Sequence, residues 1–136
     1  MKKTILVLSL FVLMTASVFT QNLLTGAYQG IDPQGNVMPV WAFVAADSAF
    51  DQNGRAVQQN GHVIMLIFAG EPSSNNRPSL SLQGSVAGNQ VFYIIYSAEP
   101  GSGVTPGQSD VFTIYNSQTF GDRSGYRYVW RRYGRD

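Results

Sequence analysis

Short apolar segments separated by turn sequences run through most of this 136-residue chain, and they constrain its fold more than any other feature. The residues between the segments are rich in Gly, Pro, Asn, Asp and Ser, which favour turns. No window shows the 3.6-residue periodicity of an amphipathic helix, apart from one helical turn expected near residues 45–50. The pattern predicts strands at residues 23–30, 38–46, 55–59, 62–69, 80–86, 91–96, 111–115 and 126–133.

The turn sequences favour an antiparallel order of these strands. Residues 32–35 and 51–54 both read Asp-x-x-Gly, a sequence typical of type I turns, and Asn60-Gly61 is typical of a two-residue hairpin. The segments 62–69 and 91–96 are apolar on both faces, as in a strand covered on both sides or set in a barrel wall. We therefore predict an all-β fold, an antiparallel meander of seven to eight strands closing into a small barrel. A β-sandwich is the alternative.

The first twenty residues have the features of a signal peptide. Lys2 and Lys3 precede an apolar run over residues 5–14, which is too short for a membrane span of roughly 20 residues. Val18 and Thr20 are suitable for cleavage before Gln21; a cut after Ala16 is the alternative. We predict a signal peptide at residues 1–20 and a single domain at residues 21–136, secreted or periplasmic.

Charge is sparse and unevenly distributed in the remaining 116 residues. Charged residues make up 12% of the full chain, about half of the usual share. Residues 21–122 hold two Arg and seven acidic residues, whereas residues 123–136 hold five Arg and one acidic residue. The chain has no cysteine, so disulfides cannot support the domain. No second apolar stretch is long enough to span a bilayer, so we expect no transmembrane segment after signal cleavage.

The sequence offers little for catalysis or metal binding. His62 is the only histidine and there is no cysteine, so a transition-metal site would need mostly carboxylates. No Gly-x-Ser-x-Gly nucleophile motif is present, and most acidic residues lie in turn sequences. We predict no catalytic residues, no metal site and no cofactor, and hence a protein that is not an enzyme.

The C-terminal segment is the strongest candidate for a binding role. Alternation places Tyr126, Tyr128 and Trp130 on one face and Arg127 and Arg131 on the other. In one interpretation the aromatic residues fill the core and the arginines face solvent. In the other, the arginines point into a barrel mouth and bind an anionic ligand. Arg interleaved with aromatic residues also suits nucleic acid, but seven Arg against eight acidic residues after cleavage argue against that partner.

Both ends of the expected mature domain carry a family resemblance. Residues 24–28, Leu-Thr-Gly-Ala-Tyr, resemble the Leu-x-Gly-x-aromatic start of lipocalin-like domains. Residues 128–132, Tyr-Val-Trp-Arg-Arg, are similar to the last strand of small exported bacterial lipocalin-like (calycin-type) β-barrel proteins. The resemblance implies a small barrel that binds a ligand in its interior.

The leading hypothesis is a secreted, non-enzymatic β-barrel that binds a small apolar or amphipathic ligand, or an anionic one. Its candidate ligand-binding residues are Trp41, Phe43, Tyr96, Arg127, Tyr128, Trp130 and Arg131. The alternative is a structural or protein-interaction module of the cell envelope, with a filled core and an Arg-rich edge strand. A cavity of roughly 300 Å³ or more would favour the binder, whereas a packed core would favour the alternative.

The signal peptide yields the first testable prediction. When the full chain is expressed in an exporting bacterial host, the extracytoplasmic protein should begin at or near Gln21. N-terminal sequencing of that protein checks this. Recovery of exported protein that retains Met1 would contradict it.

Overall fold

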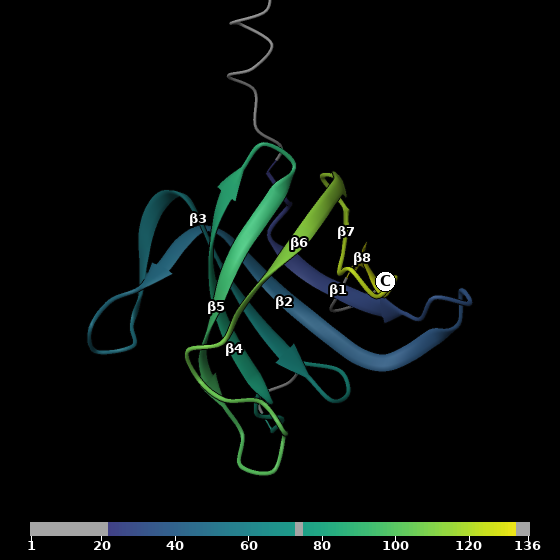
Figure 1. The fold of residues 1–136 in the computed structure, drawn as a ribbon, viewed down its shortest axis with the longest axis horizontal. Coiled ribbons are helices and arrows are strands. Elements are labelled where there is room, and N and C mark those ends of the chain that lie inside the picture. The colour runs from purple at the N-terminus through teal and green to yellow at the C-terminus, as the bar shows by residue number, and fades with distance from the viewer. Residues whose placement is uncertain (1–21, 73–74, 133–136) are drawn as a thin grey trace, which may run out of the picture.

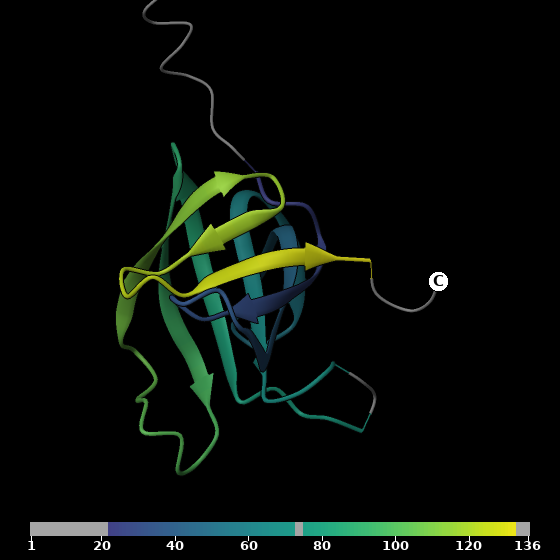
Figure 2. The same cartoon turned by 90° about the vertical axis from the view of Figure 1, so that its right-hand side faces the viewer.

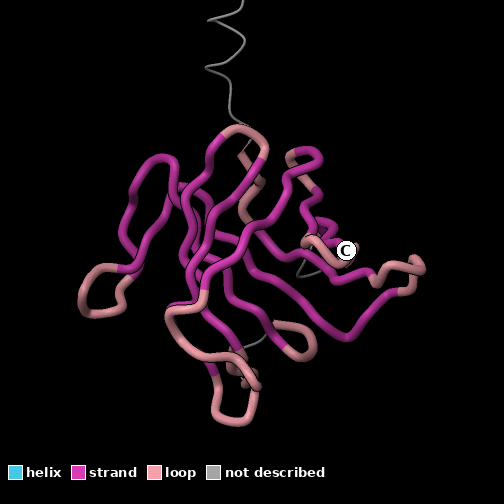
Figure 3. The backbone as a smooth tube through the Cα atoms, in the orientation of Figure 1, coloured by secondary structure: helices cyan, strands magenta, loops and turns pink. Residues whose placement is uncertain are grey.

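The computed structural model describes residues 22–72 and 75–132, which form one closed antiparallel β-barrel (Figure 1). Figure 3 shows strands and loops and no helix in this part of the chain. The strands follow one another around the barrel in chain order, which confirms the predicted meander. They are β1 (Gly26–Ile31), β2 (Val37–Phe50), β3 (Ala56–Phe68), β4 (Leu80–Ala87), β5 (Gln90–Ala98), β6 (Ser109–Asn116), β7 (Thr119–Gly121) and β8 (Arg127–Arg131).

The barrel closes where the last strand meets the first. Strand β8 pairs with β1 in an unbroken register from Ala27↔Arg131 to Ile31↔Arg127, and its other side pairs with β7 (Figure 2). The arginine-rich strand is therefore not an edge strand, and that part of the alternative hypothesis was wrong. The expected signal peptide, residues 1–20, and Tyr133, the last residue of the expected final strand, lie outside the described residues.

Three turns of the same sequence type join strands of the barrel. In each, an Asp is followed three residues later by Gly, whose amide donates to the Asp carbonyl, at 2.9 Å for Asp32 and 3.0 Å for Asp51. The Asp carboxylate also accepts hydrogen bonds from backbone amides of the following residues, so these amides in the turn have acceptors. At Asp32 these donors, above all the Asn36 amide, lower the pKa of the carboxyl. The turns predicted at residues 32–35 and 51–54 are confirmed.

Inward-facing side chains fill most of the barrel. Aromatic rings stack at its centre, with 5.0 Å between the ring centroids of Phe120 and Tyr128 and 4.5 Å between those of Tyr93 and Phe112. Aliphatic side chains from β2 to β6 complete this cluster: Val44, Val63, Met65, Leu82, Val91, Ile95 and Ile114. Each buried Val, Ile, Leu or Met side chain contributes about 1.5–3 kcal/mol. The cluster therefore supplies the stability that a cysteine-free domain needs.

One end of the barrel is sealed by the segment that precedes β1. Leu23 is buried in the core cluster, and the Leu24 amide donates to the Ser117 carbonyl at 2.9 Å. The hydroxyl of the fully buried Tyr28 lies 2.6 Å from the Leu24 carbonyl and 3.2 Å from that of Ser117. One phenol thus ties the start of β1 to the β6–β7 turn. Burial outweighs the Leu24 hydrogen bond and raises the pKa of Tyr28, so the hydroxyl keeps its proton.

The β2–β3 hairpin differs from the sequence prediction. Asn60-Gly61 is not a hairpin turn, because β3 runs through it from Ala56 to Phe68, and residues 55–59 are not a separate strand. The sequence marks an irregularity instead: the pairing shifts between Ala46 and Ser48, where Asp47 and Gly61 have φ of 56° and 82°. Asn60-Gly61 resembles a turn because this bulge also needs a positive φ. The helical turn expected near residues 45–50 was also wrong, since this stretch belongs to β2.

Beyond this irregularity the hairpin forms an arm, residues 48–59, that folds over the outside of the barrel. The Phe50 amide donates to the Gln83 side chain of β4 at 2.7 Å, and the Phe50 and Tyr96 rings lie 4.7 Å apart. The Tyr96 hydroxyl donates to the Asp51 carbonyl at 3.4 Å. The arm therefore makes a ridge across the outer face of β4 that reaches β5.

Strand β5 is apolar on both faces, as the sequence shows, but only its inner face is covered. Val91 and Ile95 are buried in the core, whereas Phe92, Ile94 and Tyr96 are 52%, 45% and 41% exposed. Of the two explanations for its apolar sequence, β5 therefore fits a strand of a barrel wall and not a strand covered on both sides.

The sealed end supplies a stability prediction. Tyr28→Phe removes the phenol that joins Leu24 to Ser117 and should lower the free energy of unfolding by about 1–3 kcal/mol. Urea unfolding of both proteins measures the loss. Tyr126→Phe, which removes an exposed hydroxyl, is the control and should change it by less than about 0.5 kcal/mol. Equal stability of Tyr28→Phe and wild type would show that the hydroxyl does not hold this end of the barrel.

Candidate ligand-binding site

The opposite end of the barrel is open and leads into a cavity of about 190 Å³. Its walls come from β3, β4, β5, β6 and β8, from the loop after β5 and from the turn after β7. The lining residues are Ile67, Leu80, Leu82, Tyr93, Ile95, Val104, Phe112, Asp122 and Tyr128. The cavity is apolar except for one carboxylate and two phenols, a composition typical of small-molecule sites. It falls short of the roughly 300 Å³ that would favour a ligand-binding barrel over one with a filled core, so only a small ligand, or a small part of one, can enter.

A second hollow of about 200 Å³ adjoins the first at the mouth. It is lined by Tyr93, Ile95 and Val104, which also line the first cavity, together with Gln108, Ser109 and Asp110. Val104 belongs to the loop over residues 99–108, whose backbone is tied to β5 by the Gly107 amide, 2.8 Å from the Ile95 carbonyl. The half-buried Val104 side chain therefore lines both spaces.

Two carboxylates stand at the mouth, each already engaged. Asp110 and Arg123 form an ion pair at 2.8 Å, with side chains 42% and 76% exposed. Exposed pairs of this kind contribute little to stability. One oxygen of Asp122 accepts the Ser124 and Tyr126 amides at 2.9 and 3.1 Å and shapes the turn that leads to β8. Because Arg123 offsets Asp110, the three side chains give the mouth one net negative charge over an apolar floor.

The two phenols of the cavity stay neutral well above neutral pH. Burial raises the pKa of Tyr128 to about 12, and the nearby Asp122 adds to the shift. Burial also raises the pKa of Tyr93; Asp110 and Asp122 reinforce the shift and Arg123 opposes it. Each phenol presents one hydroxyl that can donate and accept a hydrogen bond.

Of the seven residues predicted to bind a ligand, only Tyr128 lines this cavity. Trp41 and Phe43 point out of the barrel, because Ala42 and Val44 between and beside them face its core. They belong to a separate outer cluster with Ala27, Leu66 and Phe68. Trp41 is buried there, so it adds to the wall and not to the site.

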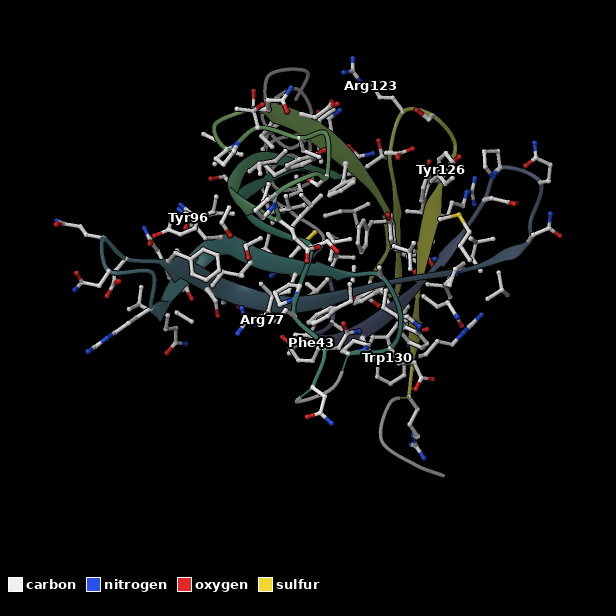
Figure 4. The ribbon with its side chains drawn as sticks, turned by 90° about the horizontal axis from the view of Figure 1, so that it is seen from below. Phe43, Arg77, Tyr96, Arg123, Tyr126 and Trp130 are labelled. Carbon is white, nitrogen blue, oxygen red and sulfur yellow. The ribbon has the colours of Figure 1, made fainter. Side chains whose placement is uncertain are left out.

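The other four predicted residues are dispersed. Figure 4 shows Tyr96 beside the arm and far from Trp130. Trp130 packs against the core cluster, and its indole NH donates to the Thr25 carbonyl at 3.4 Å. Arg127 and Arg131 are exposed, and the Arg127 guanidinium lies 4.4 Å from the centroid of the Tyr115 ring. Neither arginine lines the cavity, so this arrangement matches the interpretation in which the arginines face solvent.

Eight of the nine lining residues were not predicted from the sequence, among them Tyr93, the loop residue Val104 and the carboxylate Asp122. Tyr93 could have been found from the alternation of β5, where it shares a face with Val91 and Ile95. Val104 lies in an irregular loop whose path over the mouth has no signal in the sequence. Asp122 has the pattern of an ordinary turn residue, and only barrel closure places it at the cavity.

Comparison with known proteins finds no match to this chain among protein families, curated proteins or solved structures. Within residues 22–72 and 75–132, no three His, Cys, Asp or Glu side chains come together as a metal-binding group. The same residues contain no helix long and apolar enough to cross a membrane.

The raised pKa of Tyr128 predicts how stability changes at high pH. An unfolded tyrosine loses its proton near pH 10, whereas folded Tyr128 keeps it until about pH 12. Its contribution to stability is therefore complete below pH 10 and is lost as the pH rises to about 12. Tyr128→Phe should make the decline of unfolding free energy in this range shallower by up to about 1.4 kcal/mol per pH unit. Urea unfolding at several pH values measures the slope.

The control is the same pair of proteins between pH 7 and 8, where Tyr128 keeps its proton in the folded and unfolded states and the two slopes should be equal. If Tyr128→Phe also has the wild-type slope at high pH, the proton of Tyr128 is not held by the fold.

Proposed function

We propose that this protein is an exported, non-enzymatic, lipocalin-like barrel that binds a small amphipathic molecule at its open end. The observation that carries the proposal is the cavity of about 190 Å³, apolar within and polar at its rim. It lies opposite the end sealed by Tyr28, so the barrel has one entrance. Export, with residues 1–20 removed, rests on the signal-peptide features of the sequence.

The cavity volume limits what can enter. About 190 Å³ is roughly six times the 30 Å³ that a water molecule occupies in the liquid, enough for about six heavy atoms. The buried part of the ligand is therefore a short alkyl chain or a small ring. A larger ligand would leave its remainder outside, against the second hollow and the loop over residues 99–108.

The polar groups favour a particular end group on that ligand. The Tyr93 and Tyr128 hydroxyls can hydrogen-bond a hydroxyl or amine. Arg123 offsets the charge of Asp110, so these three side chains leave the mouth with the negative charge of Asp122. A carboxylate at the same place would be repelled by Asp122. We therefore favour a neutral or cationic end group over the anionic ligand considered from the sequence.

A homologous series of alcohols tests the proposal. Binding of 1-butanol, 1-hexanol and 1-octanol by isothermal calorimetry should strengthen by about 0.8 kcal/mol per buried CH₂ and level off near six carbons. Hexylamine should bind at least as well as 1-hexanol, and hexanoate more weakly.

A matched pair of variants locates the site. Val104→Trp places a large side chain between the two hollows and should reduce 1-hexanol affinity at least tenfold. Val37→Trp makes the same change at a position that is 62% exposed and outside the cavity, and should bind as wild type does. Binding that is absent in wild type, or equal in the two variants, would refute a site in this cavity.

A further inference from the structure

The outer face of β5 carries an apolar stripe made of Phe92, Ile94 and Tyr96. These three side chains alternate with the inward residues of β5 and are 52%, 45% and 41% exposed. Single exposed apolar residues are common on protein surfaces, whereas a contiguous row of large ones is a candidate interaction surface. The cavity is on the other side of this wall, so ligand binding leaves the stripe unexplained.

The strand that carries the stripe and its neighbour β4 are uncharged, and the arm that contacts Tyr96 carries one charge of each sign, Asp51 and Arg55. Strands β4 and β5 contain no Asp, Glu, Lys or Arg among their seventeen residues. On β6 the partner of Phe92 is Val111, whereas Asp110 pairs with the inward-facing Tyr93. A second copy of the same face would meet no excess of like charge, because the strands are uncharged and the arm carries one charge of each sign.

The arm gives the surface a shape that can complement itself. It lies over Gln83 of β4 and contacts Tyr96, so it forms a ridge along one side of the stripe. On the other side, β6 carries no such ridge. If a two-fold axis runs along β5, each arm lies beside the partner's β6, and the two ridges do not collide. Figure 4 shows Tyr96 at the foot of this ridge.

We propose that this face is the interface of a symmetric homodimer, in which the two β5 stripes meet and each arm flanks the other copy. About the two-fold axis, Ile94 meets Ile94 of the second copy, and the aromatic residues on either side pair in the same way. Such an interface is isologous, because both copies use the same patch.

The size of the surface indicates a weak dimer. Three strands about 4.8 Å apart, each with about eight residues spaced by about 3.3 Å, cover roughly 400 Å². Stable complexes bury about 800 Å² on each partner, so this interface is at the lower end even with the arms added. Dissociation constants in the micromolar range or weaker are expected, and the measurements must reach high concentration.

Sedimentation equilibrium of the exported protein from about 1 µM to 1 mM should show a reversible monomer–dimer equilibrium, a range chosen for weak complexes. Ile94→Arg brings two like charges together at the axis and should weaken the dimer at least tenfold. Val37→Arg makes a similar change at an exposed apolar position away from β5 and should not. Circular dichroism and urea unfolding confirm that both variants are folded.

The absence of native cysteine allows an independent test of the symmetry. Ile94→Cys should form a cross-linked dimer with a short bismaleimide, because the same residue of each copy lies at the axis, whereas Val37→Cys should stay monomeric. Three outcomes would overturn the proposal. They are a monomer throughout the concentration range, a dimer that survives Ile94→Arg, and equal cross-linking of the two cysteine variants.

Discussion

The structure depends on the pairing of β8 with β1, which turns an eight-strand meander into a closed barrel. The pairing is made by residues near the two ends of the described chain, Gly26–Ile31 and Arg127–Arg131, over a continuous register. Without it, both strands would have a side of unpaired backbone groups, and the aromatic cluster would be open to solvent. On its other side β8 pairs with β7, where Phe120 lies opposite Tyr128 with ring planes 13° apart, so closure and core packing depend on the same strand.

Closure also explains why the two ends of the barrel differ. Tyr28 and the segment before β1 seal one end with two carbonyl contacts from a single phenol. At the other end the strands are joined by Asp-x-x-Gly turns and by the loop over residues 99–108, which stand around the opening without filling it. Because the barrel is sealed at one end and open at the other, its cavity has a single entrance. The same rings that stabilise the barrel, Tyr93 and Tyr128, therefore also form the walls of its cavity.

The sequence predicted the fold class and most strands because their signals are local. A strand with one buried face needs alternating apolar residues, and an Asp-x-x-Gly turn needs only four consecutive residues. Both features appear in the structure where the sequence predicts them. Asn60-Gly61 was misinterpreted because a bulge and a hairpin turn need the same positive φ, and only the facing Asp47 distinguishes them. The outer faces of Trp41 and Ile94 are equally apolar, yet one is buried and the other is 45% exposed. Trp41 is covered by residues of the neighbouring strands, Ala27 and Phe68, and this long-range packing leaves no local pattern in the sequence.

The candidate site was less predictable than the fold, for a related reason. The sequence favoured large aromatic residues and arginines as site residues. Alternation along each strand places some of them on one face of the barrel wall and some on the other. When the barrel closes, one face lines the interior and the other faces outward. Trp41 and Phe43 stabilise the outside, while Tyr128 alone of that group contributes to the cavity. The inner and outer faces consequently have independent properties. The inner face of the barrel forms a small cavity with a polar rim. The outer face of β5 carries an uncharged apolar stripe. Since a residue of β5 belongs to only one of these faces, Ile94 can be changed without altering the cavity that its neighbours Tyr93 and Ile95 line.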